Sequence, residues 1–207
     1  MTQKFTIHSV NPQKRLIAQA VKMLRSGAVV VYPTDSSYAL GCQIGDKEAL
    51  DRIRQIRSLD ARHNLTLICK DLSELSTYAK VGNSAFRLMK SLTPGPYTFL
   101  LMATRDVPRR LQHPKRKTIG IRVPDHPVTQ ALLDEMQEPL LTTSLILPGM
   151  QQPLNDPDEI EKRLGNRVDL ILDCGACGLD HTTVIDLTED FPKLVRAGIG
   201  DTSIIGS

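Results

Sequence analysis

Residues 28–41 read AVVVYPTDSSYALG and predict a buried strand that ends in a polar loop. The apolar strand runs from Ala28 to Tyr32, and Pro33 ends it because proline has no backbone N–H to donate to a neighbouring strand. The loop then carries short hydroxyl and carboxyl side chains: Thr34, Asp35, Ser36 and Ser37. Ligands of α/β proteins bind at the carboxyl ends of strands, so these residues form either a ligand site or an ordinary polar loop.

Apolar residues along the rest of the chain alternate between strand and helical spacing. Further strands are predicted at residues 65–69, 97–103, 118–123, 140–146, 169–172, 183–187 and 193–196. Helices are predicted between most of them, over 16–24, 49–56 and 156–164 and after the N-cap candidates Asp46, Asp71, Asn83 and Asp125. This order predicts an α/β protein with one twisted mixed sheet flanked by helices, and with a terminal hairpin.

Length and composition are those of an ordinary globular protein. The chain has 207 residues, of which 41% are hydrophobic and 24% charged, so we expect a single domain over residues 1–207. No apolar run approaches the roughly 18 residues of a membrane helix. The N-terminal residues lack the apolar core of a signal peptide. We therefore expect a cytoplasmic protein without a membrane partner.

The positive charge of the chain is small but clustered. The formal net charge is +3 and the pI is about 8.7. The densest basic cluster comprises Arg105, Arg109, Arg110, Lys115, Arg116 and Lys117. No aromatic residue lies among them, so stacking on single-stranded bases is not expected. A solvated surface loop and a contact with the backbone of double-stranded RNA remain the alternatives.

The four cysteines fall into two pairs. Cys42 and Cys69 lie in or beside predicted strands and are expected to be buried. Cys174 and Cys177 form a CxxC motif followed by His181, which is a turn, a redox pair or part of a zinc site. A strand rather than a helix follows the motif, unlike in thioredoxin-type pairs, and zinc would need a fourth ligand from elsewhere. No structural metal is expected.

Hydroxyl groups and arginines on neighbouring elements favour binding of phosphate or carboxylate. The hydroxyls lie on or at the ends of predicted strands: Thr34, Ser36, Thr118, Thr142, Thr143, Ser144 and Thr182. Arg57, Arg122 and Arg196 stand on neighbouring elements, and a guanidinium binds either anion bidentately. The chain has no P-loop, no dinucleotide-binding GxGxxG, no Ser-His-Asp arrangement and no HExxH motif.

Six sequence blocks resemble the YrdC-like family of threonylcarbamoyl-AMP synthases. Residues 33–41, PTDSSYALG, are similar to the family signature PTDTVYGLG. The other blocks are 94–98 (PGPYT), 118–127 (TIGIRVPDHP), 142–144 (TTS), 182–186 (TTVID) and 196–198 (RAG). The chain length and the variant motifs are closest to the YciO-type branch. The resemblance implies a YrdC-like fold with a basic concave cleft.

The resemblance also implies a chemistry. Family members make threonylcarbamoyl-adenylate from L-threonine, bicarbonate and ATP with Mg, and the product serves tRNA modification at adenosine 37. Matched by position, the amino acid would be held by Ser36, Arg122, Thr142 and Thr182. The nucleotide would lie near Thr118, Ser144 and Arg196, and Arg57 would take the place of the lysine in the family's KxR motif.

Two departures from the family pattern leave the function open. The KxR motif is Arg57-Ser58-Leu59, and the family's S-A-N is Ser144-Leu145-Ile146. Removing one charge-assisted hydrogen bond to a transferring phosphoryl group costs on the order of 3 kcal/mol. The candidates to replace the missing groups are Arg54, Arg62, His63 and Asn64.

The sequence therefore favours a protein that binds double-stranded RNA or tRNA through its basic cleft. The residues expected to contact RNA are Arg109, Arg110, Arg116 and Lys117. The alternative is a weak L-threonylcarbamoyladenylate synthase, which would be a nucleotidyltransferase. The position of the arginines separates the two, because an enclosed pocket favours the enzyme and an open groove favours RNA.

Overall fold

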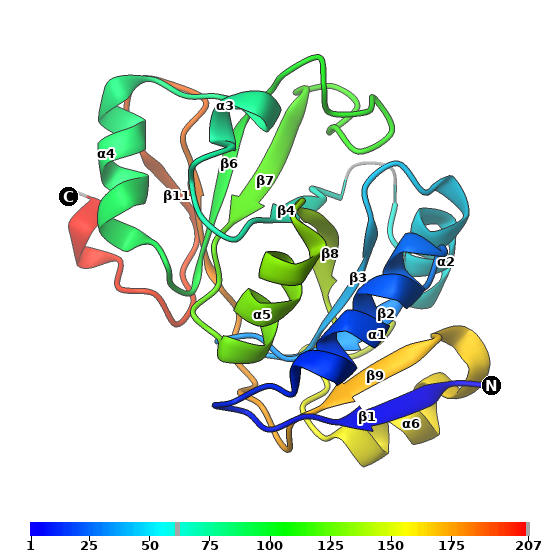
Figure 1. Ribbon diagram of the computed structural model, residues 1–207. Helices are drawn as coiled ribbons and strands as arrows, with labels where there is room; N and C mark the ends of the chain where they lie inside the picture. Colours follow the sequence, from blue (N-terminus) through cyan, green and yellow to red (C-terminus); the bar gives the residue numbers. More distant parts are fainter. Residues whose placement is uncertain (61–62, 206–207) are drawn as a thin grey trace.

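The computed structural model describes residues 1–60 and 63–205 (Figure 1). Its strands are Gln3–Thr6 (β1), Val30–Tyr32 (β2), Ala39–Gln43 (β3), Thr66–Ile68 (β4), Ala79–Lys80 (β5), Tyr97–Ala103 (β6), Thr118–Arg122 (β7), Leu140–Ser144 (β8), Leu170–Asp173 (β9), Thr183–Asp186 (β10) and Lys193–Arg196 (β11). Its helices are Lys14–Arg25 (α1), Lys47–Arg57 (α2), Leu75–Tyr78 (α3), Asn83–Leu92 (α4), Pro127–Met136 (α5) and Pro157–Leu164 (α6), with 3-10 turns at Gly165–Arg167 (η1) and Ser203–Ile205 (η2).

All of these strands join one mixed sheet, as predicted. The strand order is β1-β9-β2-β3-β8-β4-β7-β6-β10-β11, and β5 pairs with β6 beside this path. Parallel pairs join β9 to β1 and β2, β4 to β7, and β6 to β10. The other pairs are antiparallel, including the predicted terminal hairpin of β10 and β11. None of the helices in the described part of the chain is long and apolar enough to cross a membrane.

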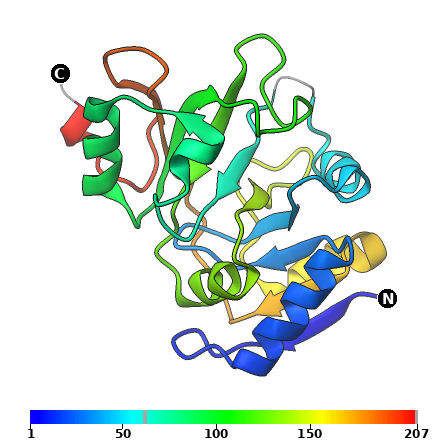
Figure 2. The same ribbon diagram turned by 45° about the horizontal axis from the view of Figure 1, so that its top comes forward.

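Helices α1 and α5 lie side by side across one part of one sheet face (Figures 1 and 2). Ile17, Val21 and Leu24 of α1 pack in the same buried cluster as Leu132 and Leu133 of α5. From the sheet, this cluster takes Val30, Tyr32, Ala39, Ile68, Leu140, Leu170 and Leu172. The remaining helices cover the opposite face, where α2, α4 and α6 pack in the larger buried cluster.

The sheet face that α1 and α5 cover extends further, across β4, β7, β6 and β10, where these two helices do not cover it. Directly paired residues share a face of a sheet, and alternate residues along each strand do so as well. The register pairs Thr66 with Thr142 and with Gly120, Gly120 with Leu100, and Thr98 with Val184. The same face is therefore apolar in one part and threonine-rich in the other.

Three predicted helix caps are wrong. The Asp71 carboxylate accepts the Ser73 N–H at 2.7 Å in a turn, and α3 begins later. Asn83 is the first residue of α4 and makes no side-chain cap. His126 caps α5 by accepting the Val128 N–H at 3.3 Å, while the backbone amide of Asp125 donates to another carboxylate. Asp46 does cap α2, as predicted. Strands β1 and β3 were not predicted.

Candidate functional site

A cleft of about 500 Å³ lies over the threonine-rich part of the sheet face. It is lined by Ala39, Arg57, His63, Asn64, Thr66, Thr98, Leu100, Arg122, Thr142, Thr143, Ser144, Ile146, Thr182, Val184, Val195 and Arg196. These residues come from β3, β4, β6, β7, β8, β10 and β11, from the end of α2, and from adjoining loops. Hydroxyl groups and cations predominate, and none of these lining residues is a carboxylate.

Hydrogen bonds between strands hold the threonine hydroxyls of the cleft floor. The Thr98 and Thr182 hydroxyls lie 2.9 Å apart. The Thr142 hydroxyl lies 2.5 Å from the Tyr32 hydroxyl and donates to the Leu40 carbonyl at 3.2 Å. Glycine is required at position 120, because a Cβ there would lie 2.5 Å from Thr66 Oγ1. The floor is therefore a packed layer of small polar side chains.

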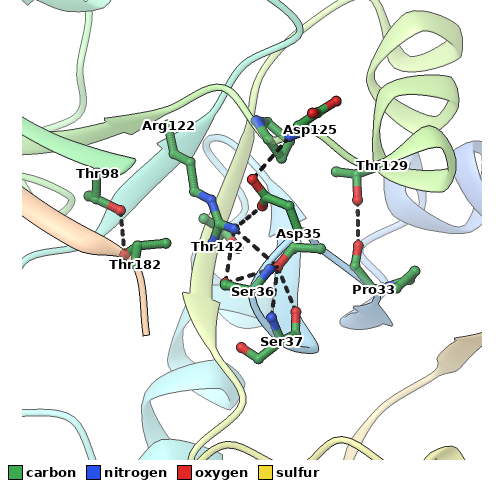
Figure 3. Close-up of polar contacts among 12 residues, drawn as sticks. Pro33, Asp35, Ser36, Ser37, Thr98, Arg122, Asp125, Thr129, Thr142 and Thr182 are labelled. Carbon is green, nitrogen blue, oxygen red and sulfur yellow. Dashed lines mark hydrogen bonds and ion pairs between the residues drawn. The ribbon is translucent and has the colours of Figure 1, made fainter. Parts of the chain in front are cut away.

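Arg122 joins the end of β7 to the loop that follows β2 (Figure 3). Its Nη2 donates to Ser36 Oγ at 3.0 Å, to Thr34 Oγ1 at 3.1 Å and to the carboxylate of Asp35. The ion pair is buried, with side-chain exposures of 6% for Arg122 and 10% for Asp35. A buried guanidinium needs a charge partner and filled hydrogen bonds, so this ion pair fixes the position of Arg122.

The loop that follows β2 is held by hydrogen bonds within itself and to the segment that begins α5. Thr34 Oγ1 donates to the Ser37 carbonyl at 2.6 Å, which closes a turn within the loop. Asp35 Oδ2 accepts the Asp125 N–H at 3.2 Å, and the hydroxyl of Thr129 in α5 donates to the Pro33 carbonyl. The loop residues are mostly buried, and three of them contact Arg122.

Two guanidinium nitrogens of the cleft have no hydrogen-bond partner among the described residues. Arg57 Nε and Arg122 Nε are buried and make no hydrogen bond within the described part of the chain. A buried donor without an acceptor is costly, and such groups in native proteins usually have a function. Both arginines line the cleft, so an anion bound there would supply the missing acceptors.

Arg196 closes the other side of the cleft. Its Nε and Nη2 donate to the Thr182 carbonyl at 3.2 and 3.0 Å, and Nη2 also donates to the Thr182 hydroxyl at 3.2 Å. Burial lowers the pKa of Arg196, and the charge of Arg122 lowers it further. Burial also lowers the pKa of Arg57. Arginine still stays protonated, so the cleft holds closely spaced positive charges that an anion would stabilise.

His63 lies among these cations. Burial lowers the pKa of His63, the charge of Arg57 lowers it further, Asp60 opposes these effects, and Arg196 adds a smaller lowering effect. An imidazole with a pKa below its usual value of about 6.5 is uncharged at neutral pH. His63 therefore offers a neutral ring to a ligand in a cleft whose other ionisable lining residues are arginines.

The structure brings most of the predicted site residues together. Arg57, Arg122, Thr142, Ser144, Thr182 and Arg196 all line the cleft. Ser36 lies behind Arg122 and contacts it without lining the cleft. Thr118 is 1% exposed and hydrogen-bonds at 3.5 Å to Asn64, which does line the cleft.

The candidates for replacing the missing motif groups have separate positions. His63 and Asn64 line the cleft. Arg54 instead donates to the Arg110 carbonyl at 2.8 Å, away from the cleft. Arg62 lies outside the described residues. Thr66 was not predicted as a site residue. It pairs directly with Thr142 across β4 and β8, so the two side chains lie on the same face of the sheet.

The two departures from the family pattern lie in different surroundings. Ile146 lines the cleft, where the family motif has an amide. Leu59 packs against the larger apolar cluster, and its N–H bonds to the Arg54 carbonyl at the end of α2. Ser58 before it has a φ of 50°, so the helix ends in a left-handed turn that is followed by an apolar contact. Leu59 therefore has a structural role in ending the helix.

The predicted RNA-contacting residues lie apart from the cleft lining. Arg109, Arg110, Arg116 and Lys117 are exposed on the loop between β6 and β7. Arg116 forms an ion pair with Asp186, and Arg110 donates to the Gly45 carbonyl. Lys117 Nζ donates to the Pro114 carbonyl at 2.7 Å. These side chains form an exposed basic loop, part of which is tied to the rest of the protein.

The cysteines are all free thiols. Cys42 and Cys69 are buried, as predicted, with exposures of 0% and 5%. Cys174 and Cys177 are half-buried. Within residues 1–60 and 63–205, no group of three or more His, Cys, Asp or Glu side chains is arranged to hold a metal ion.

Comparison with known sequences places these features in a family. The profile of the Sua5, YciO and YrdC proteins, described as "Telomere recombination", matches residues 22–198. "Uncharacterized protein YciO" of Escherichia coli K12 is 60% identical over 97% of this chain and 98% of its own length. A "Threonylcarbamoyl-AMP synthase" of Vibrio vulnificus is 33% identical over 75% of this chain and 84% of its own length.

Solved structures agree with this relationship. The crystal structure of E. coli YciO matches with a TM-score of 0.94 over 97% of this chain and 98% of that chain. P. abyssi Sua5 complexed with L-threonine matches with a TM-score of 0.87 at 27% identity, over 95% of this chain and 58% of that chain. The predicted YrdC-like fold is thereby confirmed.

Proposed function

The chain belongs to the Sua5, YciO and YrdC family, and from that premise we propose that its cleft binds an amino acid and a nucleotide of the threonylcarbamoyl-adenylate type. The single observation that carries this proposal is the buried Arg122, held by Asp35 and Ser36, with its Nε unpaired at the cleft. The Sua5 structure solved with L-threonine supports it, as does the Vibrio synthase.

Arg122 is the proposed partner of the amino-acid carboxylate. One nitrogen, Nη2, holds the Thr34–Ser36 loop, and Nε remains free to donate to the ligand. The hydroxyls of Thr142 and Thr182 line the same cleft. Thr142 already donates to the Leu40 carbonyl, so it can only accept from the ammonium group, whereas Thr182 can donate to the carboxylate when Thr98 donates to Thr182. A guanidinium that is already fixed loses little side-chain entropy when it binds a carboxylate.

Arg57 and Arg196 are the proposed partners of the phosphate groups. Nε of Arg57 is also buried and has no partner among residues 1–60 and 63–205, and Arg196 is held by Thr182. Phosphoryl transfer relies on positioning and on charge stabilisation, because the protein makes no covalent bond to the substrate. In the synthase reaction a carbamate oxygen attacks the α-phosphorus of ATP and pyrophosphate leaves. The cations of this cleft would stabilise the charge that develops on the phosphate.

ATP would then be a substrate, accompanied by magnesium. Magnesium binds through few protein carboxylates and takes other ligands from phosphate and water. The described lining residues include no carboxylate, and Asp35 is engaged by Arg122. A magnesium ion would therefore be held chiefly by the phosphate oxygens of the nucleotide.

The activity we propose is a weak one. Ile146 offers the nucleotide an aliphatic surface where the family motif has an amide, and Leu59 is packed against the core at the end of α2. The absence of one stabilising hydrogen bond at the transition state costs on the order of 3 kcal/mol, which is about a hundredfold in rate. Binding of the substrates depends less on these positions than the chemical step does.

Two measurements test this function. The first is equilibrium binding of L-threonine and of ATP by calorimetry, and the second is pyrophosphate release with bicarbonate and a panel of amino acids. Arg122→Lys keeps the positive charge next to Asp35 but removes the planar set of N–H donors of the guanidinium. The affinity for threonine should therefore fall about tenfold or more. Arg116→Lys is the matched control, since Arg116 pairs with Asp186 outside the cleft lining. Unchanged threonine binding in Arg122→Lys would refute the carboxylate assignment.

A second candidate function is binding of double-stranded RNA or tRNA. The observation in its favour is the exposed basic loop of Arg109, Arg110, Arg116 and Lys117. Interactions of such side chains with phosphates are insensitive to sequence and depend steeply on salt. The cleft is lined by other residues, so RNA would contact a surface beside it.

The RNA proposal is tested by the salt dependence of affinity. Replacing the four basic residues by glutamine should reduce the slope of log affinity against log salt, by up to about 0.9 for each phosphate that the variant no longer neutralises. Arg15, Lys22, Arg87 and Lys90, on helices α1 and α4, provide a control with the same charge change. An equal effect in both variants would show only a general charge effect.

A further inference from the structure

The CxxC motif places two thiols at the edge of the Arg122 loop. Cys174 follows β9, and its thiol lies close enough to the Cys177 thiol for each to change the acidity of the other. The backbone of Cys177 is fixed by Asn155, whose carbonyl accepts the Cys177 N–H at 3.0 Å and whose amide donates to the Cys177 carbonyl at 3.3 Å. Gly175 has a φ of 86°, so the segment turns back and brings the two cysteines together.

Polar groups from other elements surround Cys174. The Tyr38 hydroxyl lies 3.7 Å from Cys174 Sγ, accepts the Cys174 N–H at 3.2 Å and donates to the Gly175 carbonyl at 2.7 Å. The His126 ring also lies near the Cys174 thiol. Nδ1 of His126 accepts the Val128 N–H at 3.3 Å, so Nε2 is the nitrogen left to face Cys174.

These contacts separate the acidity of the two thiols. The nearby Cys177 thiol is the main cause that lowers the pKa of Cys174, burial opposes this effect, and the nearby His126 ring and Tyr38 hydroxyl lower the pKa further. The same contact with Cys174, together with burial, raises the pKa of Cys177. This division gives one attacking thiolate and one thiol that keeps its proton, as a reactive pair requires.

The pair also touches the loop that holds Arg122. The Thr34 backbone amide, which donates to the Ser37 carbonyl at 3.1 Å, lies near the Cys177 thiol. The next residue, Gly178, lies so close to the loop that a Cβ there would be 2.5 Å from the Ser36 carbonyl oxygen. Thr34 and Ser36 are both hydrogen-bonded to Arg122. A displacement of Cys177 would therefore shift the Thr34–Ser36 loop, and the loop would shift Arg122 in the cleft.

We propose that Cys174 and Cys177 form a thiol–disulfide couple that hydroperoxides oxidise and that weakens anion binding at Arg122. The Cys174 thiolate attacks the peroxide, an S–O bond forms, the O–O bond breaks, and the leaving oxygen takes a proton. Cys177 then attacks the sulfenic sulfur, an S–S bond forms, the S–O bond breaks, and water leaves with the Cys177 proton. Two thiols are oxidised by two electrons, and the hydroperoxide is reduced to water and an alcohol or a second water.

The test is to oxidise the reduced protein with hydrogen peroxide, unfold it, alkylate it and measure its mass. The chain has four cysteines, so the reduced protein takes four alkyl groups and the oxidised protein should take only two. The peptide that spans 174–177 should have lost the mass of two hydrogens. Cys69→Ala, which removes a buried thiol, is the control, and oxidation should still reduce its number of alkyl groups by two. Four alkyl groups on the oxidised wild type, or a disulfide at other cysteines, would overturn the proposal.

The order of attack is tested by the single variants. In Cys177→Ser, peroxide should leave a sulfenic acid on Cys174 that dimedone traps, whereas Cys174→Ser should react at least about tenfold more slowly. The pH midpoint of alkylation at Cys174 in wild type should lie below the usual value of about 8.5, and it should rise in Cys177→Ser. Equal trapping in the two variants would contradict the assignment of Cys174 as the attacking thiol.

The effect on the cleft rests on the proposed function and has its own readout. Sulfate affinity should fall severalfold in the oxidised wild type and stay unchanged in peroxide-treated Cys177→Ser under conditions where only the couple reacts. Equal affinity in both redox states would refute the coupling. If neither state bound sulfate, the proposed function and the coupling would both fail, whereas the disulfide would stand on the mass measurement.

Discussion

The two parts of one sheet face differ according to what covers them. Under α1 and α5 the face carries Val30, Tyr32, Ile68, Leu140, Leu170 and Leu172, and all of them are fully buried. Beyond these helices the same face carries Thr66, Thr98, Thr142 and Arg122 around a cleft of about 500 Å³. One sheet face therefore forms part of the core and also the floor of the cleft, and the extent of two helices sets the boundary.

The comparison shows how the protein keeps polar groups at the centre of a sheet. Polar side chains in the open part hydrogen-bond to neighbouring strands or loops, as in the Thr98–Thr182 and Arg122–Ser36 pairs. Buried polar groups are tolerated where they have partners. Arg57 Nε and Arg122 Nε are exceptions among the described residues, and they lie where an anion would bind.

The largest effect is expected in the open part, at Arg122. Arg122→Met leaves the Asp35 carboxylate buried without its charge partner, which should cost about 3–5 kcal/mol of unfolding free energy. Urea denaturation measures this loss. The double variant Arg122→Met, Asp35→Asn should recover a large part of it, because the unpaired charge is removed. A single variant as stable as wild type would show that the ion pair has no structural role.

The covered part should respond to loss of volume. Leu140→Ala removes a fully buried side chain beneath α1 and α5, so the unfolding free energy should fall by about 2–5 kcal/mol. Sulfate binding of the folded protein should remain unchanged. Thr98→Ala is the contrasting variant on the open part, where the loss should be about 1 kcal/mol. Equal losses at the two positions would remove the distinction between the two parts.

The chemical step should respond to Ile146. Ile146→Asn restores the amide of the family motif at the cleft wall and should raise threonine-dependent pyrophosphate release about tenfold. Leu59→Arg is the less suitable change, because Leu59 packs against the core at the end of α2. A folded Ile146→Asn protein without any gain would mean that this wall does not face the nucleotide.

The smallest effect concerns pH. Burial and Arg57 lower the pKa of His63, so its ring is neutral at neutral pH and gains a positive charge only as the pH falls below its usual value of about 6.5. Sulfate keeps its charge across this range, so its affinity should rise severalfold on acidification. His63→Asn should abolish this rise. The same rise in the variant would point to another titrating group.

Sequence reasoning identified the main features of the fold because they depend on local patterns. The strand before Pro33, the hairpin of β10 and β11 and the Asp46 cap all follow from propensity and turn chemistry. Strand β3 was missed because its sequence ALGCQ contains a glycine that only tertiary packing explains, where Tyr32 approaches Gly41. The predicted Asp125 cap is wrong because α5 begins at Pro127, so His126 takes the N-cap position and its ring accepts the Val128 N–H.

The site was predictable only in part for a similar reason. Arg122, Thr142, Thr182 and Arg196 were expected from motifs, and the structure gathers them in one cleft. The opposite surroundings of Leu59 and Ile146 depend on which way each side chain points after its helix or strand ends. No local pattern encodes that direction. The closeness of Cys177 to the Thr34 loop likewise depends on the order of strands in the sheet. The two segments follow β9 and β2, which are neighbours in the sheet but far apart in the chain.

The wide sequence separation of the cleft residues has a consequence for protein synthesis. The cleft takes Arg57 from the first third of the chain and Arg196 from its last strand, and Arg122 bonds to Ser36 across 86 residues. Contacts of such high sequence separation form late in folding. During translation, a growing chain that has not yet released β10 and β11 has no closed cleft. Any ligand that the cleft binds can therefore be bound only after residues 183–196 have left the ribosome.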